Sequence, residues 1–179
     1  MARPDFTNSE NSIKEIIRVN YAGEYGAKRI YEGQLNYCKN REAYSTIKHM
    51  MQQEEVHLNY FTNSLLQRNV RPTFLIPFWH IIGYIVGSGS ILVGTKTAML
   101  LTQSVEEVIE QHYQKQIDYL EGYNVEKELL DNIKQFQFDE TEHKDTALVL
   151  GSSEVAFASL INKIVKLMCN IAINISKKV

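Results

Sequence analysis

The chain has 179 residues, of which 44% are apolar and 22% charged, with a formal net charge of −2. This length fits one domain with a substantial core, and the composition is that of an ordinary globular protein. The small negative charge gives no case for nucleic-acid binding, which usually shows as a basic surplus. The polar N-terminal residues 1–15 contain no apolar run, so we expect no secretory signal there.

Helix-forming residues dominate, and no alternating strand pattern is present. Asn40 and the Gly-Tyr-Asn stretch at 122–124 have turn chemistry, so the helices on either side of each turn should form antiparallel hairpins. A long apolar connection, 69–90, separates the two hairpins. The pattern therefore predicts an all-α, four-helix bundle with an internal pseudo-twofold. The expected helices cover about 9–38, 41–68, 91–121 and 125–150.

Each predicted helix carries a glutamate on the stripe where apolar residues belong. The second and fourth also carry a histidine three residues after the glutamate, and the Glu-x-x-His spacing occurs nowhere else in the chain. Residues three and four apart share one helix face, so all these side chains should point into the bundle. The two halves of the chain thus repeat one pattern. The six inward residues are Glu24, Glu54, His57, Glu106, Glu140 and His143.

Four buried carboxylates facing one another would repel, and no Lys or Arg falls on these stretches of stripe to neutralise them. Two divalent metal ions match their charge, and two neutral imidazoles complete the ligand set. The absence of thiolate ligands argues against structural zinc and copper, and imidazole argues against calcium and magnesium. We therefore predict two iron ions, with manganese as the alternative metal. The other interpretation, a wetter seam of the bundle, is hard to reconcile with six matching positions.

Five stretches of the chain carry specific motifs: RVNYAGEYGAKRIYEGQL (18–35), QQEEVHL (52–58), RPTFLIPFW (71–79), VEEVIEQHYQKQI (105–117) and DETEHKD (139–145). With these motifs the chain resembles the demethoxyubiquinone hydroxylase family of ubiquinone biosynthesis, the 2-polyprenyl-3-methyl-6-methoxy-1,4-benzoquinol monooxygenases. The resemblance covers nearly the whole chain.

The resemblance implies a ferritin-like di-iron carboxylate protein with two Fe ions per chain and O₂ as co-substrate. It implies a monooxygenase that hydroxylates the ring of a demethoxyubiquinol through a di-iron peroxo-level species. NADH is the candidate reductant, although no dinucleotide-binding glycine motif is present. The candidate partners are a polyprenyl quinol, a membrane surface, other ubiquinone-biosynthesis proteins and further copies of the chain; no nucleic acid is expected.

When the family's motifs are matched to this sequence, the resemblance implies the same six residues as metal ligands, with Glu54 and Glu140 as bridging ligands. The family also suggests His112 and Tyr113 as an electron or proton route, against ordinary packing as the alternative. Where the family usually has a histidine before AGEYG, this chain has Tyr21. Of the acidic neighbours, Glu107 is expected to be solvated, whereas a carboxylate such as Asp139 could orient a ligand imidazole.

Residues 72–95 carry no formal charge and are long enough to cross a membrane. Pro77 and four glycines interrupt this segment, and a spanning segment would place the two hairpins on opposite sides of the bilayer. We therefore expect a membrane-dipping crossover that lies on the bilayer, with a buried core connection as the alternative. The amphipathic C-terminal segment, 154–179, could attach to the same surface or close the bundle. These features predict a peripheral membrane protein, on the cytoplasmic face of a bacterial inner membrane or the matrix face of an organelle.

Three other functions fit parts of the pattern. A ferroxidase or iron-storage protein would use the same metal site but would not need the apolar segment 72–95. A non-catalytic membrane-bound helical scaffold would need no metal. A membrane di-iron oxidase or desaturase would differ only in its substrate.

Overall fold

A computed structural model describes residues 6–178, and it describes the side chains of residues 10–177. The first five residues of the polar N-terminal segment and the last residue of the C-terminal segment lie outside the described residues. No strand occurs between residues 6 and 178, and the predicted all-α fold is confirmed. The elements are α1 (Phe6–Tyr37), α2 (Arg41–Gln67), α3 (Ile76–Val93), α4 (Thr95–Tyr123), α5 (Lys127–Val149), a 3₁₀ turn η1 (Ser152–Glu154) and α6 (Ala158–Lys178).

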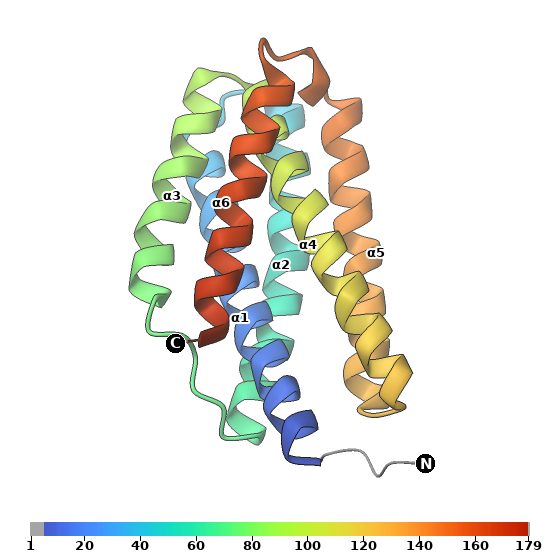
Figure 1. The fold of residues 1–179 in the computed structure, drawn as a ribbon. Coiled ribbons are helices and arrows are strands. Elements are labelled where there is room, and N and C mark those ends of the chain that lie inside the picture. The colour runs from blue at the N-terminus through green and yellow to red at the C-terminus, as the bar shows by residue number, and fades with distance from the viewer. Residues whose placement is uncertain (1–5, 179) are drawn as a thin grey trace.

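The helices α1, α2, α4 and α5 form the predicted bundle, with α1 packed against α2 and α4 packed against α5 (Figure 1). Each pair is an antiparallel hairpin closed by the expected turn chemistry. The Asn40 side chain accepts a hydrogen bond from the Ala43 N–H at 3.0 Å and so caps the start of α2. Asn124 ends α4 in the left-handed conformation, with φ of 51°.

The connection between the hairpins contains an 18-residue helix, α3, that the sequence did not reveal, and α4 begins at Thr95 rather than near residue 91. Pro77 lies in the first turn of α3, where a missing N–H removes no helix hydrogen bond. Pro77 and the glycines of this segment suggested an interrupted helix, but they are compatible with a continuous one.

The glycines of α3 are the reason for its close packing against α1. A Cβ added at Gly87 would overlap the Ile30 carbonyl oxygen and lie 2.8 Å from its carbonyl carbon. On the α1 side, a Cβ at Gly33 would lie 2.8 Å from the Ser88 backbone nitrogen. The two helix backbones therefore approach more closely than any residue with a side chain would allow.

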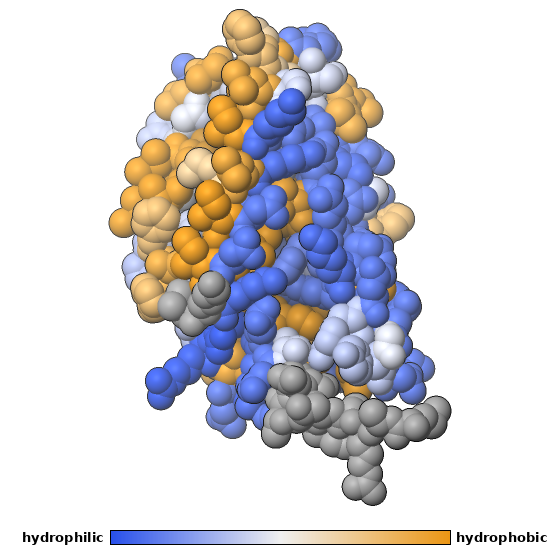
Figure 2. Space-filling model, in the orientation of Figure 1, coloured by the Kyte–Doolittle hydropathy of each residue, from blue (hydrophilic) through white to orange (hydrophobic). Residues whose placement is uncertain are grey.

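The last helix, α6, packs against α4 and α1 and leaves its opposite face uncovered (Figure 1). Together with α3 it gives one side of the molecule a hydrophobic surface (Figure 2). Both α3 and the Ala158–Lys177 stretch of α6 are long and apolar enough to cross a membrane by length and composition alone. The exposed apolar residues of these two helices include Phe78, Ile81, Ile85, Leu92, Val93, Leu160, Ile164, Leu167, Met168, Ile171 and Ile175.

Two apolar clusters fill the bundle on either side of its middle. One cluster is centred on Ile17, Phe61, Leu120 and Ile133, and the other on Ile47, Met50, Met99 and Ala147. Along each of the four bundle helices, the predicted inward glutamate lies between residues of the first cluster and residues of the second. The fold therefore places one polar layer at mid-height, enclosed above and below by packed apolar side chains.

Candidate metal centre

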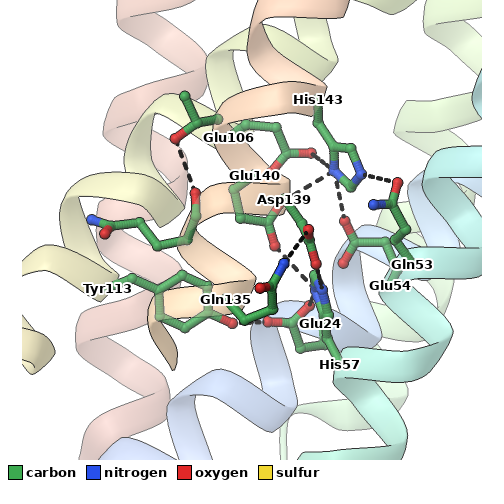
Figure 3. A network of polar contacts seen from close by, with 12 residues as sticks. Glu24, Gln53, Glu54, His57, Glu106, Tyr113, Gln135, Asp139, Glu140 and His143 are labelled. Carbon is green, nitrogen blue, oxygen red and sulfur yellow. Dashed lines mark hydrogen bonds and ion pairs between the residues drawn. The ribbon is translucent and has the colours of Figure 1, made fainter. Parts of the chain in front are cut away.

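All four bundle helices contribute to this polar layer, and they bring the six predicted side chains together. The helix α1 supplies one glutamate, α4 another, and α2 and α5 each supply a Glu-x-x-His pair (Figure 3). Their relative exposures are between 0 and 2%: Glu24 1%, Glu54 0%, His57 1%, Glu106 1%, Glu140 0% and His143 2%.

The ligand atoms form two overlapping groups, and within each group they lie within 4.8 Å of one another. The first group contains Glu24 and His57, and the second contains Glu106 and His143. Glu54 and Glu140 belong to both groups. This geometry suits two cations with two carboxylates between them, which is the arrangement of a di-metal carboxylate site.

Each imidazole turns its Nδ1 atom toward the carboxylates. His57 Nδ1 lies 3.3 Å from Glu140 and 3.5 Å from Glu24. His143 Nδ1 lies 3.2 Å from Glu140 and 3.4 Å from Glu54. These are ion-pair distances, yet neither Nδ1 atom makes a hydrogen bond. The Nδ1 atoms are therefore the ones that a cation between the carboxylates would reach.

The outer nitrogen of each imidazole has a partner on the opposite hairpin (Figure 3). His57 Nε2 lies 3.0 Å from Asp139 Oδ2, and Asp139 Oδ1 accepts a hydrogen bond from Gln135 at 3.0 Å. His143 Nε2 lies 3.0 Å from Gln53 Oε1. An imidazole that binds metal through Nδ1 carries its proton on Nε2, so both histidines would donate these hydrogen bonds.

Two buried tyrosines hold the two single glutamates in a crosswise manner. Tyr31 on α1 donates a hydrogen bond to Glu106 Oε1 on α4 at 2.7 Å, and Tyr113 on α4 donates one to Glu24 Oε1 on α1. One oxygen of each glutamate is thus occupied by a tyrosine hydroxyl, and the other is left without a hydrogen-bond partner.

Burial disfavours the ionised form of two of the four glutamates, Glu54 and Glu106. Burial, followed by the charge of Glu140, raises the pKa of Glu54 and of Glu106 well above the usual value. Burial alone would also raise the pKa of Glu140, but the two nearby imidazoles lower it to about 2. Burial would lower the pKa of His57, but the carboxylates of Glu140 and Glu24 raise it to about 12. A cation that binds here must displace protons from Glu54, Glu106 and His57.

The residues fit a bound metal because each of the six has at least one buried oxygen or nitrogen atom without a hydrogen-bond partner. Buried polar atoms are almost always paired in native structures, so such a concentration calls for an explanation. Among side chains 10–177, no Lys or Arg forms an ion pair with any of the four glutamates. Buried carboxylates and imidazoles that converge without a Lys or Arg countercharge indicate a metal site.

Comparison with known proteins agrees with this site. A sequence model of the family described as ubiquinone biosynthesis protein COQ7 matches residues 11–176. The chain belongs to the COQ7 family. It is 39% identical, over 93% of its length and 78% of the relative's, to the rat (Rattus norvegicus) NADPH-dependent 3-demethoxyubiquinone 3-hydroxylase, mitochondrial.

Two further members of the COQ7 family show the same degree of similarity in distant organisms. The 3-demethoxyubiquinol 3-hydroxylase of Rhodospirillum rubrum is 38% identical, over 93% of this chain and 78% of the relative. The 5-demethoxyubiquinone hydroxylase, mitochondrial, of Saccharomyces cerevisiae is 36% identical, over 90% of this chain and 76% of the relative. The family match, residues 11–176, includes the site-bearing parts of all four helices.

The other residues singled out from the sequence lie in different places. Tyr113 reaches the site through Glu24, whereas His112 lines a cavity of about 200 Å³ between α1 and α4, together with Lys115 and Lys177. Burial, with a smaller contribution from these two lysines, lowers the pKa of His112 to about 4. The role of the His112–Tyr113 pair stays a prediction.

Two residues near the ligand candidates were not predicted correctly: the environment of Glu107 differs from the expected one, and Tyr31 was missed. Glu107 was expected to be solvated, but α6 covers it: it accepts hydrogen bonds from Gln103 at 2.7 Å and Asn162 at 3.1 Å and pairs with Lys166. Tyr31 was not singled out, although a signal was available. It follows Glu24 by seven residues, two helical turns, as Tyr113 follows Glu106.

Proposed function

We propose that this chain is an O₂-dependent monooxygenase that hydroxylates the ring of a demethoxyubiquinol, as the names of its COQ7-family relatives indicate for those proteins. The observation that carries the proposal is the buried layer of four carboxylates and two imidazoles with unpaired ligand atoms. We assign the six residues of this layer as the ligands of two metal ions, with Glu54 and Glu140 shared between them.

We assign iron as the metal. Carboxylate and imidazole ligands without thiolate suit iron or manganese, and ferrous iron readily passes electrons to O₂. Iron held by these six residues would supply the two electrons that let one atom of O₂ enter the ring while the other leaves, with two protons, as water.

The polypeptide contributes orientation and the exclusion of water. Asp139 and Gln53 fix the two imidazole rings, so that Nδ1 faces the carboxylates. Tyr31 and Tyr113 hold one oxygen of each single glutamate and leave the other free for metal. The apolar clusters above and below the layer keep bulk water away from the reacting groups.

The proposed reductant is a nicotinamide cofactor, because the rat relative is named as NADPH-dependent; NADH is the alternative. His112 and Tyr113 form the proposed route for electrons or protons. Tyr113 donates a hydrogen bond to Glu24, and the adjacent residue His112 lines the cavity between α1 and α4. Tyr113→Phe should then slow reduction of the oxidised metal centre by NADPH without lowering the iron content. An unchanged reduction rate would exclude Tyr113 from the route.

We propose that the protein docks on a lipid surface with α3 and α6. A polyprenyl quinol partitions into lipid, and the exposed apolar residues of these helices lie on one side of the molecule (Figure 2). Lys163 on α6 is exposed and can contact anionic headgroups beside this surface, whereas Lys166 pairs with Glu107. The proposed location is the cytoplasmic face of a bacterial inner membrane or the matrix face of an organelle. Other ubiquinone-biosynthesis proteins and further copies of this chain are the proposed protein partners.

Anaerobic loading with two ferrous ions per chain, followed by O₂ and a demethoxyquinol with a short prenyl tail, tests the activity. We expect a product heavier by one oxygen atom, with that atom derived from labelled O₂. Ferric ion with water or hydrogen peroxide as the only products would indicate a ferroxidase and refute the hydroxylase assignment.

A pair of alanine variants on α5 provides the control. Glu140→Ala removes a fully buried ligand candidate and should abolish both iron binding and product formation. Glu142→Ala removes an exposed glutamate from the same helix and should leave both unchanged. If the two variants bound equal amounts of iron, the ligand assignment would fail.

A further inference from the structure

The two halves of the metal centre are related by an internal twofold that extends beyond the six ligand candidates. Glu24 is followed after seven residues by Tyr31, and Glu106 is followed after seven residues by Tyr113. Each tyrosine donates its hydroxyl to the glutamate of the other helix. The single carboxylates of the two halves are therefore held in equivalent ways.

The twofold is broken where the outer nitrogen of each imidazole finds its partner. Gln53 and Asp139 occupy equivalent positions, since each directly precedes the glutamate of a Glu-x-x-His pair. Each reaches across to the histidine of the other hairpin at 3.0 Å: Asp139 to His57, and Gln53 to His143 (Figure 3). The geometry is the same in both halves, but one partner is a carboxylate and the other a neutral amide.

This difference acts on the metal through the imidazole. A carboxylate that accepts the Nε2–H proton draws it away from the ring more strongly than an amide oxygen does. The ring then carries more negative charge on Nδ1 and becomes a stronger donor to a cation. Asp139 is well placed to act in this way, because it is only 15% exposed and its second oxygen is held by Gln135.

We propose that Asp139 and Gln53 make the two metal positions unequal. The position beside Glu24 and His57 binds its divalent ion more tightly and fills first. The position beside Glu106 and His143 fills second and loses its ion first. Asp139 and Gln53 are positioning residues, which set this order through the imidazoles without touching the metal. This inference rests on the proposed di-metal site and adds to it an order of loading that the six ligand candidates alone do not contain.

Isosteric exchanges at the two positions test the order directly. Asp139→Asn removes the charge behind His57, Gln53→Glu adds one behind His143, and the double variant exchanges the two partners. Crystals grown anaerobically with one ferrous ion per chain are measured at the iron absorption edge. The anomalous signal then gives the occupancy of each position.

For the unmodified chain we expect the first ion mainly beside His57. Asp139→Asn should weaken binding at that position by about tenfold or more, the range found when partners of ligand histidines are removed. Gln53→Glu should strengthen binding beside His143, and the double variant should place the first ion there. A reversal of this kind would not follow from a merely structural role of either residue. Ferrous titration calorimetry should show two separated steps in the unmodified chain that converge in Asp139→Asn.

The outcomes separate this inference from the function on which it rests. Equal occupancy of both positions in the unmodified chain, or a double variant that still loads first beside His57, would overturn the proposed order while leaving the di-metal site intact. Failure of every variant and of the unmodified chain to bind any iron would instead refute the metal site itself. Glu142→Gln, an exposed change on α5, serves as the control and should leave the order unchanged.

Discussion

The close contact between α3 and α1 makes a prediction whose size can be worked out from the structure. Gly87 and Gly89 lie two residues apart in the same helix, but only the first faces α1. A Cβ at Gly87 would overlap the Ile30 carbonyl oxygen and lie 2.8 Å from its carbonyl carbon, whereas a Cβ at Gly89 would meet nothing within 4 Å. Replacing each glycine by alanine therefore separates the effect of packing from the effect of helix propensity.

Alanine in place of glycine favours a helix by about 1 kcal/mol. Gly89→Ala should therefore raise the free energy of unfolding by about 1 kcal/mol. Gly87→Ala has the same gain, but the added methyl group meets backbone atoms that cannot move aside as a side chain would. Overpacking costs about 1–3 kcal/mol, and contact with backbone belongs at the upper end of that range. The net effect is a destabilisation of about 2 kcal/mol, so the two variants should differ by about 3 kcal/mol.

Thermal unfolding in detergent micelles measures this difference. For a chain of this size, 1 kcal/mol changes Tm by about 2–4 °C, so the two variants should differ by roughly 6–12 °C. The single tryptophan, Trp79, lies on α3 and reports locally, because its emission should shift to longer wavelength if α3 separates from α1. Equal Tm values for the two variants, or equal emission spectra, would refute the account of α3 packing.

Four further outcomes follow from burial and charge. Glu54→Gln removes a carboxylate whose pKa burial raises, so it should stabilise the metal-free chain and abolish the rise in Tm on adding ferrous ion; a normal rise would argue against Glu54 as a ligand. Because the pKa values of Glu54 and Glu106 lie above 4.5 in the folded chain, the metal-free chain should lose stability as pH rises above that value. Metal binding should release protons from these carboxyls, and calorimetry in buffers of different ionisation enthalpy measures this release. Burial and two nearby lysines lower the pKa of His112 from 6.5 to about 4, so the free energy of unfolding should fall by up to about 3 kcal/mol as pH falls through this interval. Urea unfolding of His112→Gln should show a flatter pH dependence than that of the unmodified chain. Leu167→Glu on the exposed face of α6 should weaken sedimentation with anionic lipid vesicles, while Leu148→Glu on α5 should not; equal binding would place the lipid contact elsewhere.

The composition of the polar layer could be read from the sequence because helical periodicity is a local property. Glu54 and His57 share a helix face whatever surrounds them, as do Glu140 and His143, and the apolar residues on the same stripe show that this face is buried. The turn at Asn40 was likewise visible, since its side chain bonds to a backbone group only three residues away. For these features, spacing along the chain determines position in space.

The packing of α3 could not be read in this way. Glycines within an apolar segment suggest interruption when each residue is considered alone. In the folded chain Gly83 and Gly87 instead remove the side chains that would keep α3 away from α1. Whether a glycine breaks a helix or permits close packing depends on the presence of a second backbone, and only the tertiary structure supplies that backbone.

The sequence by itself thus determined which residues enter the polar layer, because each helix arranges its own side chains. Only the tertiary structure decided how the two hairpins complete each other. Tyr31 reaches Glu106, Tyr113 reaches Glu24, and Asp139 lies behind His57 through contacts between residues 75 to 89 positions apart. No local spacing encodes such contacts, since they depend on the register at which the helices meet. The pairing of each histidine with a charged or a neutral partner was decided at that level.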